Sequence, residues 1–218
     1  MTQLAEGFNR RMAEYRFRAI KFFLEGDYCL DVGAGKGDIG KLVAPVFKEV
    51  DAIEANQEYV DEIVDIGVYG NIWNNFNKSG GHLYNTILAI DVFEHLNEDE
   101  SQTLRFLSVR NGVVIVVVPN ANSLHRRIGK AMGLIKDTTE LEQHDLDVGH
   151  KRWYTAETLE AELTGIGLTP EYLGGILLKP FPNSEMDKLS KEELDAFYEV
   201  GREYPEFCAE VMVVARKT

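Results

Sequence analysis

One segment decides the fold: Tyr28-Cys29-Leu30-Asp31-Val32-Gly33-Ala34-Gly35-Lys36-Gly37-Asp38-Ile39-Gly40. A short apolar run enters a loop with glycines at three alternate positions, and the sequence then continues into residues that favour a helix. This order predicts a β-strand, a tight turn and a helix start, an arrangement in which backbone N–H groups can approach a ligand closely. The question for the rest of the sequence is which ligand the turn binds.

Two cofactor classes use such a turn. Gly35-Lys36-Gly37-Asp38-Ile39-Gly40 spells G-x-G-x-x-G, the pattern of dinucleotide-binding turns. In a dinucleotide fold the first glycine closes the strand directly, and here that glycine is Gly33, so the third required glycine falls on Asp38. The carboxylate of Asp31 would also repel a pyrophosphate. It would instead attract the ammonium and sulfonium groups of S-adenosylmethionine, so the spacing favours that cofactor over NAD.

Several segments resemble one superfamily. Leu30–Gly37 resembles the first motif of the class I S-adenosylmethionine-dependent methyltransferases, and Asp91–Leu96 resembles their D-x-x-E-H-[LIV] signature after the fourth strand. Pro119–Arg127 and Gly149–Thr155 resemble the small-molecule methyltransferases grouped with the ubiquinone-pathway and sugar O-methyltransferases. The resemblance covers most of residues 28–178. It implies methyl transfer from S-adenosylmethionine, with S-adenosylhomocysteine as the product.

Length and composition limit the functional classes. A chain of 218 residues predicts a single domain over residues 1–218, and 44% hydrophobic with 27% charged residues is ordinary for a globular protein. A net charge of −13 argues against nucleic-acid binding. The longest purely apolar run, Val113–Val118, is too short to span a membrane, and no signal peptide is visible, so we expect a cytoplasmic protein. A homodimer is compatible with the sequence.

The order of predicted elements indicates an α/β fold. Strands and helices alternate up to the strand Gly112–Val118, which argues for a doubly wound, mostly parallel sheet. Tyr172–Leu178 and Glu210–Ala215 are expected to close this sheet as a hairpin-like pair. The resemblance implies a Rossmann-like sheet of seven strands with an antiparallel last strand. Two segments, about 120–150 and 180–205, are expected to form helical lids that select the acceptor.

Five helices outside this alternation, or bordering it, can be placed from sequence signals. Phe8–Leu24 carries an apolar stripe at helical spacing, and Arg16 or Arg18 on this helix is a candidate to reach the carboxylate of the cofactor. The others are predicted over Glu98–Val109, Leu124–Ile135 and Thr155–Gly165, and a capping box at Ser190 predicts one more, to about Tyr204.

The cofactor contacts are expected at the carboxyl ends of the strands, where open α/β sheets bind ligands. Glu54 ends the second strand and can accept hydrogen bonds from the ribose hydroxyls. Val68–Trp73 occupies the place where similar methyltransferases carry a Gly-Asp pair near the adenine, so Asn71 stands for the acid and Ile72 can pack on the ring. Asp91 with Phe93 is expected to flank the methyl pocket. The full set of predicted contacts is Asp31, Gly33, Ala34, Gly35, Gly37, Glu54, Ala55, Asn71, Ile72, Asp91, Val92, Phe93 and Arg18.

A hydroxyl acceptor must lose its proton, and histidine is the usual group to receive it because its pKa lies near the working pH. In the relatives that the sequence resembles, a histidine just before the helix after the fifth strand often lies in the acceptor pocket. That position is His150, which is therefore the first candidate for the general base. His144 and His125 are the alternatives, and His150 can also be interpreted as a residue that caps a helix or holds a lid.

Other interpretations stay open at this point. His144, Asp145, Asp147 and His150 are suitable residue types for a divalent metal ion, but their spacing fits no motif, and no metal is predicted. An anionic small-molecule acceptor would be attracted by a group of cations, namely Arg126, Arg127, Lys130, Lys151 and Arg152. A non-catalytic protein that binds S-adenosylmethionine, an N-methyltransferase and an NAD-dependent oxidoreductase are the competing functions.

Overall fold

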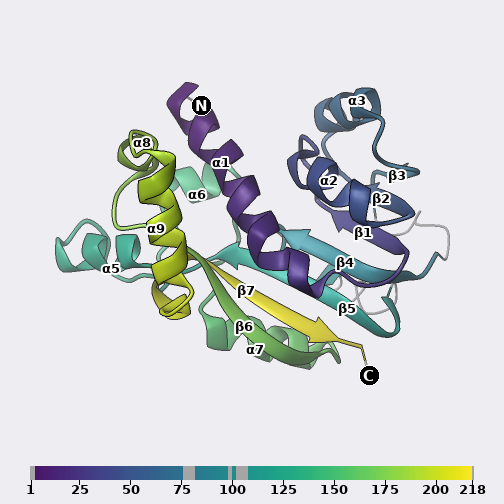
Figure 1. The fold of residues 1–218 in the computed structure, drawn as a ribbon. Helices are drawn as coiled ribbons and strands as arrows, with labels where there is room; N and C mark the ends of the chain where they lie inside the picture. The colour runs from purple at the N-terminus through teal and green to yellow at the C-terminus, as the bar shows by residue number, and fades with distance from the viewer. Residues whose placement is uncertain (1–2, 76–81, 98–99, 102–107, 218) are drawn as a thin grey trace.

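The computed structural model describes residues 3–75, 82–97, 100–101 and 108–217. Its centre is a seven-stranded sheet with the strand order β3-β2-β1-β4-β5-β7-β6 (Figure 1). The first five strands of that order are parallel, whereas β7 runs antiparallel to both β5 and β6. The prediction of a Rossmann-like α/β sheet with an antiparallel last strand is confirmed. The strands are β1 (Tyr28–Val32), β2 (Glu49–Ile53), β3 (Ile72–Trp73), β4 (Tyr84–Ile90), β5 (Ser108–Pro119), β6 (Thr169–Leu178) and β7 (Cys208–Arg216).

Helices cover both faces of the sheet. The apolar run Val113–Val118 in β5 is fully buried. Helices cover this strand on both sides, so neither of its faces needs polar residues. One hydrophobic layer joins the sheet to α1 (Gln3–Ile20), α2 (Asp38–Val43), α8 (Asn183–Met186) and α9 (Lys191–Gly201). The layer on the other face contains α7 (Ala156–Gly165). A smaller cluster packs α3 (Gln57–Ile66) against Ala34 and Ala52.

Local sequence signals set several of the helix ends. Asn56 caps α3 by accepting a hydrogen bond from the backbone of Glu58, and Ser190 and Thr155 open α9 and α7 with capping boxes. The helix expected over Leu124–Ile135 is shorter than predicted. It forms α5 (Leu124–Ala131), and the chain turns at Gly133, whose φ is 72°.

Two further boundaries differ from expectation at the edges of the described residues. The helix expected over Glu98–Val109 lies mostly outside them, and its last residues belong to β5, which begins at Ser108. The N-terminal helix α1 ends at Ile20 and continues as a 3₁₀ turn over Lys21–Phe23. A last short helix, α6 (Gln143–Asp147), lies in the segment between β5 and α7.

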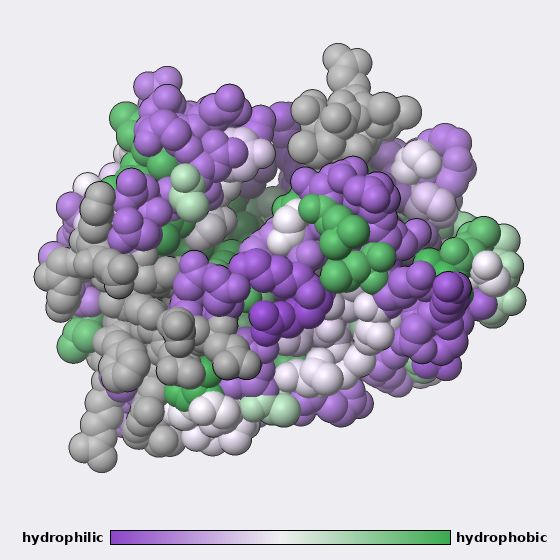
Figure 2. All heavy atoms as spheres, turned by 180° about the vertical axis from the view of Figure 1, so that it is seen from behind, coloured by the Kyte–Doolittle hydropathy of each residue, from purple (hydrophilic) through white to green (hydrophobic). Residues whose placement is uncertain are grey.

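Figure 2 shows the hydropathy of the surface on one face of the molecule. The face shown in Figure 2 is mostly hydrophilic, its hydrophobic residues lie in separate small groups, and it is hollowed near its upper middle. Among the residues that the structure describes, no helix is both long enough and apolar enough to cross a membrane. The two cysteines, Cys29 and Cys208, are buried and unpaired.

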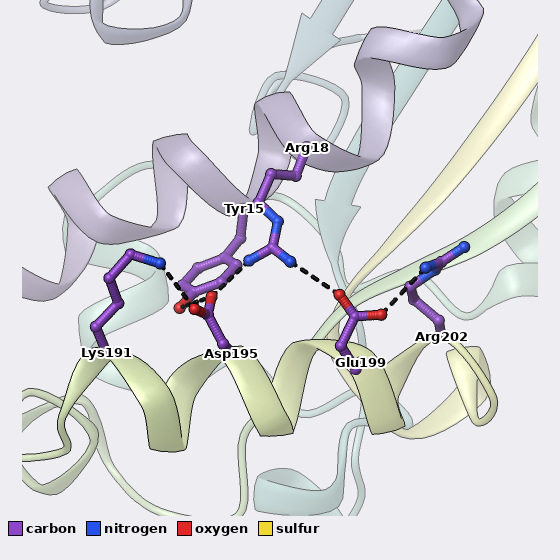
Figure 3. A network of polar contacts seen from close by, with 6 residues as sticks. All are labelled: Tyr15, Arg18, Lys191, Asp195, Glu199 and Arg202. Carbon is purple, nitrogen blue, oxygen red and sulfur yellow. Dashed lines mark hydrogen bonds and ion pairs between the residues drawn. The ribbon is translucent and has the colours of Figure 1, made fainter.

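The segment between β6 and β7 is fastened to the N-terminal helix. Arg18 of α1 lies 2.5 Å from Asp195 and 2.8 Å from Glu199, both on α9 (Figure 3). The Tyr15 hydroxyl donates to Asp195 at 3.1 Å, and Tyr198 lies below the Arg18 guanidinium at 4.3 Å from its ring centroid. Because one guanidinium combines two ion pairs with a stacked ring, this contact holds α9 against α1 more firmly than isolated surface pairs would.

We expect Arg18→Ala to lower the free energy of unfolding by about 1–2 kcal/mol, since it removes the two ion pairs and the contact with Tyr198. Urea unfolding of the full chain measures the change. The matched control is Lys48→Ala, which removes an exposed pair with Asp27 and should change the stability by less than about 0.5 kcal/mol. An Arg18→Ala variant as stable as the Lys48→Ala variant would contradict the role given to the α1–α9 contact.

Candidate active site

The glycine turn between β1 and α2 has the backbone conformation that the sequence requires. Gly33, Gly35 and Gly37 all have positive φ values, of 69°, 52° and 72°. The turn is held to the neighbouring strand because the N–H groups of Gly33 and Ala34 donate to the carbonyl of Ile53 at 2.7 and 3.3 Å. A Cβ added to Gly33 would lie 2.5 Å from the Val92 side chain. The segment after β4 therefore packs directly on the turn through Val92.

Glu54 ties the turn to the end of β2. Its side chain accepts hydrogen bonds from the backbone N–H groups of Gly35 and Asn56, both at 2.7 Å. The residue is 7% exposed, whereas Ala55 beside it is exposed. Each carboxylate oxygen keeps a further lone pair, so Glu54 can hold the turn and still accept from a hydroxyl of a ligand.

Asp31 lies at the end of β1, below the turn. It is 3% exposed and accepts a hydrogen bond from the Tyr69 hydroxyl at 2.7 Å. Burial raises the pKa of Asp31 to about 7, the Tyr69 hydrogen bond acts in the opposite direction, and the nearby Glu54 raises it further. A cationic ligand near Asp31 would lower this pKa and stabilise the carboxylate.

An arginine does reach the carboxyl edge of the sheet, but it is Arg16 and not Arg18. The Arg16 guanidinium lies between Asp91, after β4, and Glu210, in β7, and donates to Glu210 from Nε at 3.0 Å. Burial alone would lower the pKa of Arg16, but Asp91 and Glu210 together raise it, so it stays charged. Arg18, two residues later on the helix, points to α9 (Figure 3), which corrects its assignment to the cofactor.

Asp91 is held in an unusual backbone conformation. Its φ is 55°, although it is not glycine, and its N–H donates to Val117 in β5 at 2.9 Å. One carboxylate oxygen faces Arg16, whereas Oδ1 is buried without a hydrogen-bond partner. Phe93 is fully buried in the layer with α7, so its side chain belongs to the hydrophobic core and does not line an open pocket.

The adenine contacts predicted on β3 are separated by the structure. Ile72 lines a cavity of about 290 Å³ together with Gln57, Val60, Trp73 and Asn74. Asn71 lies at the amino end of β3, and its side-chain amide donates to Asp51 at 3.0 Å and to Glu49 at 3.3 Å. The amide position nearest the carboxyl edge is instead Asn74. The prediction from sequence put the carboxyl end of β3 too early in the chain. A strand of two residues is too short to show an alternating pattern of apolar and polar residues, so its end cannot be located from the sequence.

The three candidate histidines have different surroundings. His144 is exposed on α6, and His125 is partly buried in α5, where burial, Lys179 and Arg126 lower its pKa. His150 is also partly buried, with its side chain 15% exposed, and its ring centroid lies 4.8 Å from that of His95. Burial and then His95 lower the pKa of His150, so the ring is neutral near pH 7.

His150 lies in a cluster of acids and aromatic rings that the sequence did not disclose. Its Nε2 is 3.9 Å from Oε1 of Glu94, and its Nδ1 is 3.6 Å from Oδ1 of Asp145. Asp145 is itself held by the indole N–H of Trp153 at 3.0 Å. The segment after β4 and the segment before α7 meet here although more than fifty positions separate them in the sequence.

The cations expected to attract an anionic acceptor are occupied by the protein. Arg126 is buried, donates to the carbonyls of Thr138 and Glu140 at 2.6 Å each, and stacks on Trp153. It therefore holds the segment between β5 and α7 together. The other four also have partners: Arg127 on Phe207, Lys130 on Asp137, Lys151 on Asn97, and Arg152 on Leu96 and Glu162. Lys179, largely buried near Glu210 and His125, is a cation that the sequence analysis missed.

Solved structures with the same fold are methyltransferases. A methyltransferase from Archaeoglobus fulgidus, described as dependent on S-adenosylmethionine, is 17% identical, with a TM-score of 0.63 over 95% of this chain and 94% of that one. A possible histamine N-methyltransferase from Thermotoga maritima is 15% identical, with a TM-score of 0.66 over 96% and 91% of the chains. The plantazolicin methyltransferase BamL, solved with S-adenosylhomocysteine, is 15% identical, with a TM-score of 0.59 over 100% and 86%. At such identities the likeness concerns the fold.

The family is established by sequence. No curated protein sequence matches the chain. The model of a family described as "Methyltransferase domain" matches residues 5–173, which is well over half of the chain and includes the glycine turn, Glu54, Asp91 and His150. The chain therefore belongs to the methyltransferase domain family.

Proposed function

We propose that the protein transfers the methyl group of S-adenosylmethionine to a hydroxyl of a small molecule, with His150 receiving the hydroxyl proton. The proposal is carried by one arrangement: the glycine turn, Glu54 and Asp91 lie at one edge of the sheet, and a neutral, largely buried histidine lies near Asp91. Membership of the methyltransferase family sets aside the NAD-dependent alternative.

S-adenosylmethionine is the methyl donor, and the turn suits each part of it. Asp31 and the glycines would hold the methionine moiety, and Glu54 would accept from the ribose hydroxyls. Ile72, with the cavity beside it, would receive the adenine. The protein's main contribution to such an in-line displacement is to align the nucleophile, the methyl carbon and the sulfur in a site that excludes water.

His150 is the histidine best suited to act as a base. Its lowered pKa keeps it unprotonated near neutral pH, so that a ring nitrogen is available to accept a proton. The segments 120–150 and 180–205 would select the acceptor. A second candidate is transfer to an amine nitrogen, favoured by the likeness to the possible histamine N-methyltransferase.

Loss of Glu54 should weaken cofactor binding. We expect Glu54→Ala to raise the dissociation constant for S-adenosylmethionine about tenfold or more, because a hydrogen bond to a charged group contributes ~1.5–3 kcal/mol. Isothermal titration calorimetry measures the constant. Glu58→Ala, an exposed acid in the first turn of α3, is the matched control and should bind as the wild type does. Unchanged affinity in Glu54→Ala counts directly against the ribose role.

Asp31 should make the cofactor-free protein less stable as the pH rises. Its pKa is about 7 in the folded state and 3.8 as an ordinary carboxyl, so between these values the folded state holds a proton that the unfolded chain has lost. Stability contributed by this group therefore falls from about pH 4 to about pH 7.

We expect Asp31→Asn to be more stable than the wild type at pH 8, by about 2 kcal/mol, and to bind S-adenosylmethionine poorly. Urea unfolding at pH 5 and pH 8 measures the first effect and calorimetry the second. Asp38→Asn, an exposed acid at the start of α2, is the control and should leave the pH dependence unchanged. An Asp31→Asn variant with the wild-type pH dependence would show that Asp31 is ionised throughout.

His150→Gln tests the nature of the acceptor. With a hydroxyl acceptor, we expect kcat to fall about 10²-fold or more, with little change in affinity for S-adenosylmethionine, because the base is lost and the cofactor site is kept. Wild-type kcat should fall on the acid side of pH 6.5, as the ring becomes protonated. Formation of S-adenosylhomocysteine across a panel of acceptors is the assay. Full activity in His150→Gln overturns the base and favours an amine acceptor, and no product with any acceptor supports a non-catalytic binding protein.

A further inference from the structure

We propose that Glu94, His95 and His150 form a binding site for a divalent transition-metal ion, with Zn²⁺ the best fit. One potential ligand atom from each of the three lies within 4.8 Å of the others. Glu94 and His95 follow β4, and His150 precedes α7. These residues are far apart along the chain and come together only in the folded structure. The set differs from the group His144, Asp145, Asp147 and His150, because His144 and Asp147 are exposed on α6.

Glu94 is the observation that points to a cation. It is 1% exposed, and neither of its carboxylate oxygens has a hydrogen-bond partner. A carboxylate buried without a partner is strongly unfavourable, and proteins compensate such groups with a countercharge or a metal ion. His150 faces the same carboxylate, at 3.9 Å from Nε2 to Oε1.

The His95 ring is oriented as a metal ligand usually is, because its Nδ1 lies 3.1 Å from the carbonyl oxygen of Gly149. Nδ1 of His150 is buried without a hydrogen-bond partner, and the nearest acid to it is Asp145, with Oδ1 at 3.6 Å. Asp145 is fixed in turn, because it accepts from the Trp153 indole at 3.0 Å and from a backbone N–H at 2.8 Å. The oxygen on Nδ1 of His95 leaves Nε2 of that ring for an ion, and His150 has an unpartnered nitrogen to offer.

The size of the cluster also fits an ion. Ligand atoms around a tetrahedral Zn²⁺ are about 3.3 Å apart, given bonds of roughly 2.0–2.1 Å. The side chains therefore have to close by roughly 1–1.5 Å, which rotations of partly exposed rings can supply. Two imidazoles and one carboxylate suit Zn²⁺ and similar ions, whereas Mg²⁺ prefers oxygen ligands alone.

The catalytic role of this site rests on the proposed function. Three protein ligands leave a position open, and a hydroxyl bound there would have its pKa lowered by the ion. With the ion bound, the methyl transfer of the proposed function would be kept, but His150 would act as a ligand and the hydroxyl proton would pass to solvent and not to His150. Metal binding itself depends on neither S-adenosylmethionine nor an acceptor, so it can be measured separately.

The test is metal binding by the full chain after treatment with a chelator and its removal. Calorimetric titration with Zn²⁺, and the visible absorption of bound Co²⁺, are expected to report one ion per chain with a micromolar or lower dissociation constant. Mg²⁺ should bind much more weakly. Glu94→Gln and His95→Ala should each weaken Zn²⁺ binding by about 10–100-fold. His82→Ala, which removes an exposed histidine before the other end of β4, is the matched control and should bind as the wild type does.

Two results would overturn the site: no Zn²⁺ or Co²⁺ binding by the wild type, or equal losses in His82→Ala and Glu94→Gln. Unfolding is separated from ligand loss by melting temperatures without metal, where Glu94→Gln should be at least as stable as the wild type because it removes an uncompensated acid. Methyl transfer by a protein that binds no metal would overturn this inference and leave the proposed function standing. Metal binding without methyl transfer to any acceptor would support the metal site and contradict the proposed function.

Discussion

A carboxylate that is removed from water has to be hydrogen-bonded, paired with a cation or protonated, and this constraint organises the carboxyl edge of the sheet. Six acids are classed as buried among the described residues: Asp31, Asp51, Glu54, Glu94, Asp145 and Glu210. Five of them accept hydrogen bonds from the protein. Asp31 accepts from a tyrosine hydroxyl, and Asp51 accepts from a tyrosine hydroxyl and an asparagine amide. Glu54 accepts from backbone N–H groups, Asp145 from an indole and Glu210 from a guanidinium. The partners fasten the glycine turn, the edge strands and the N-terminal helix to the sheet. Glu94 is the exception, because neither of its carboxylate oxygens has a hydrogen-bond partner. This unpartnered acid is the reason to interpret the cluster of Glu94, His95 and His150 as a binding site and not only as packing.

The fold was predictable because its signals are local or periodic. The apolar run Val113–Val118 could be a strand covered on both faces, and the three glycines required a turn that no other residue type accommodates so easily. The caps at Asn56, Thr155 and Ser190 were also visible from residue type and spacing. These features depend on a few neighbouring residues, so one sequence contains enough information to place them.

The site was predictable in part. Glu54 ends β2 as expected, and its hydrogen bond to the glycine turn was not foreseen. Arg16 and Arg18 are two residues apart, and helical spacing alone did not say which one faces Asp91. The side chain of Phe93 lies in the hydrophobic core and not at a pocket. Asn71 lies at the amino end of β3, whereas a cofactor contact was expected at the carboxyl end, and β3 is too short to show a sequence pattern. The cluster around His150 depends on a contact between distant segments, and no local signal in a single sequence reports such a contact.

The position of β7 has a consequence for how the chain folds. This strand follows all the others in the sequence, yet it lies between β5 and β6, and its residue Glu210 holds Arg16 of the first helix. During synthesis, β6 therefore cannot pair with β7 until residues Cys208–Arg216 have been made. Arg16 likewise cannot form its ion pair with Glu210 until that residue has been made. Contacts between segments nearly two hundred residues apart raise the contact order, which slows folding. The part of the carboxyl edge where Arg16 meets Asp91 and Glu210 is consequently among the last parts of the molecule to be completed.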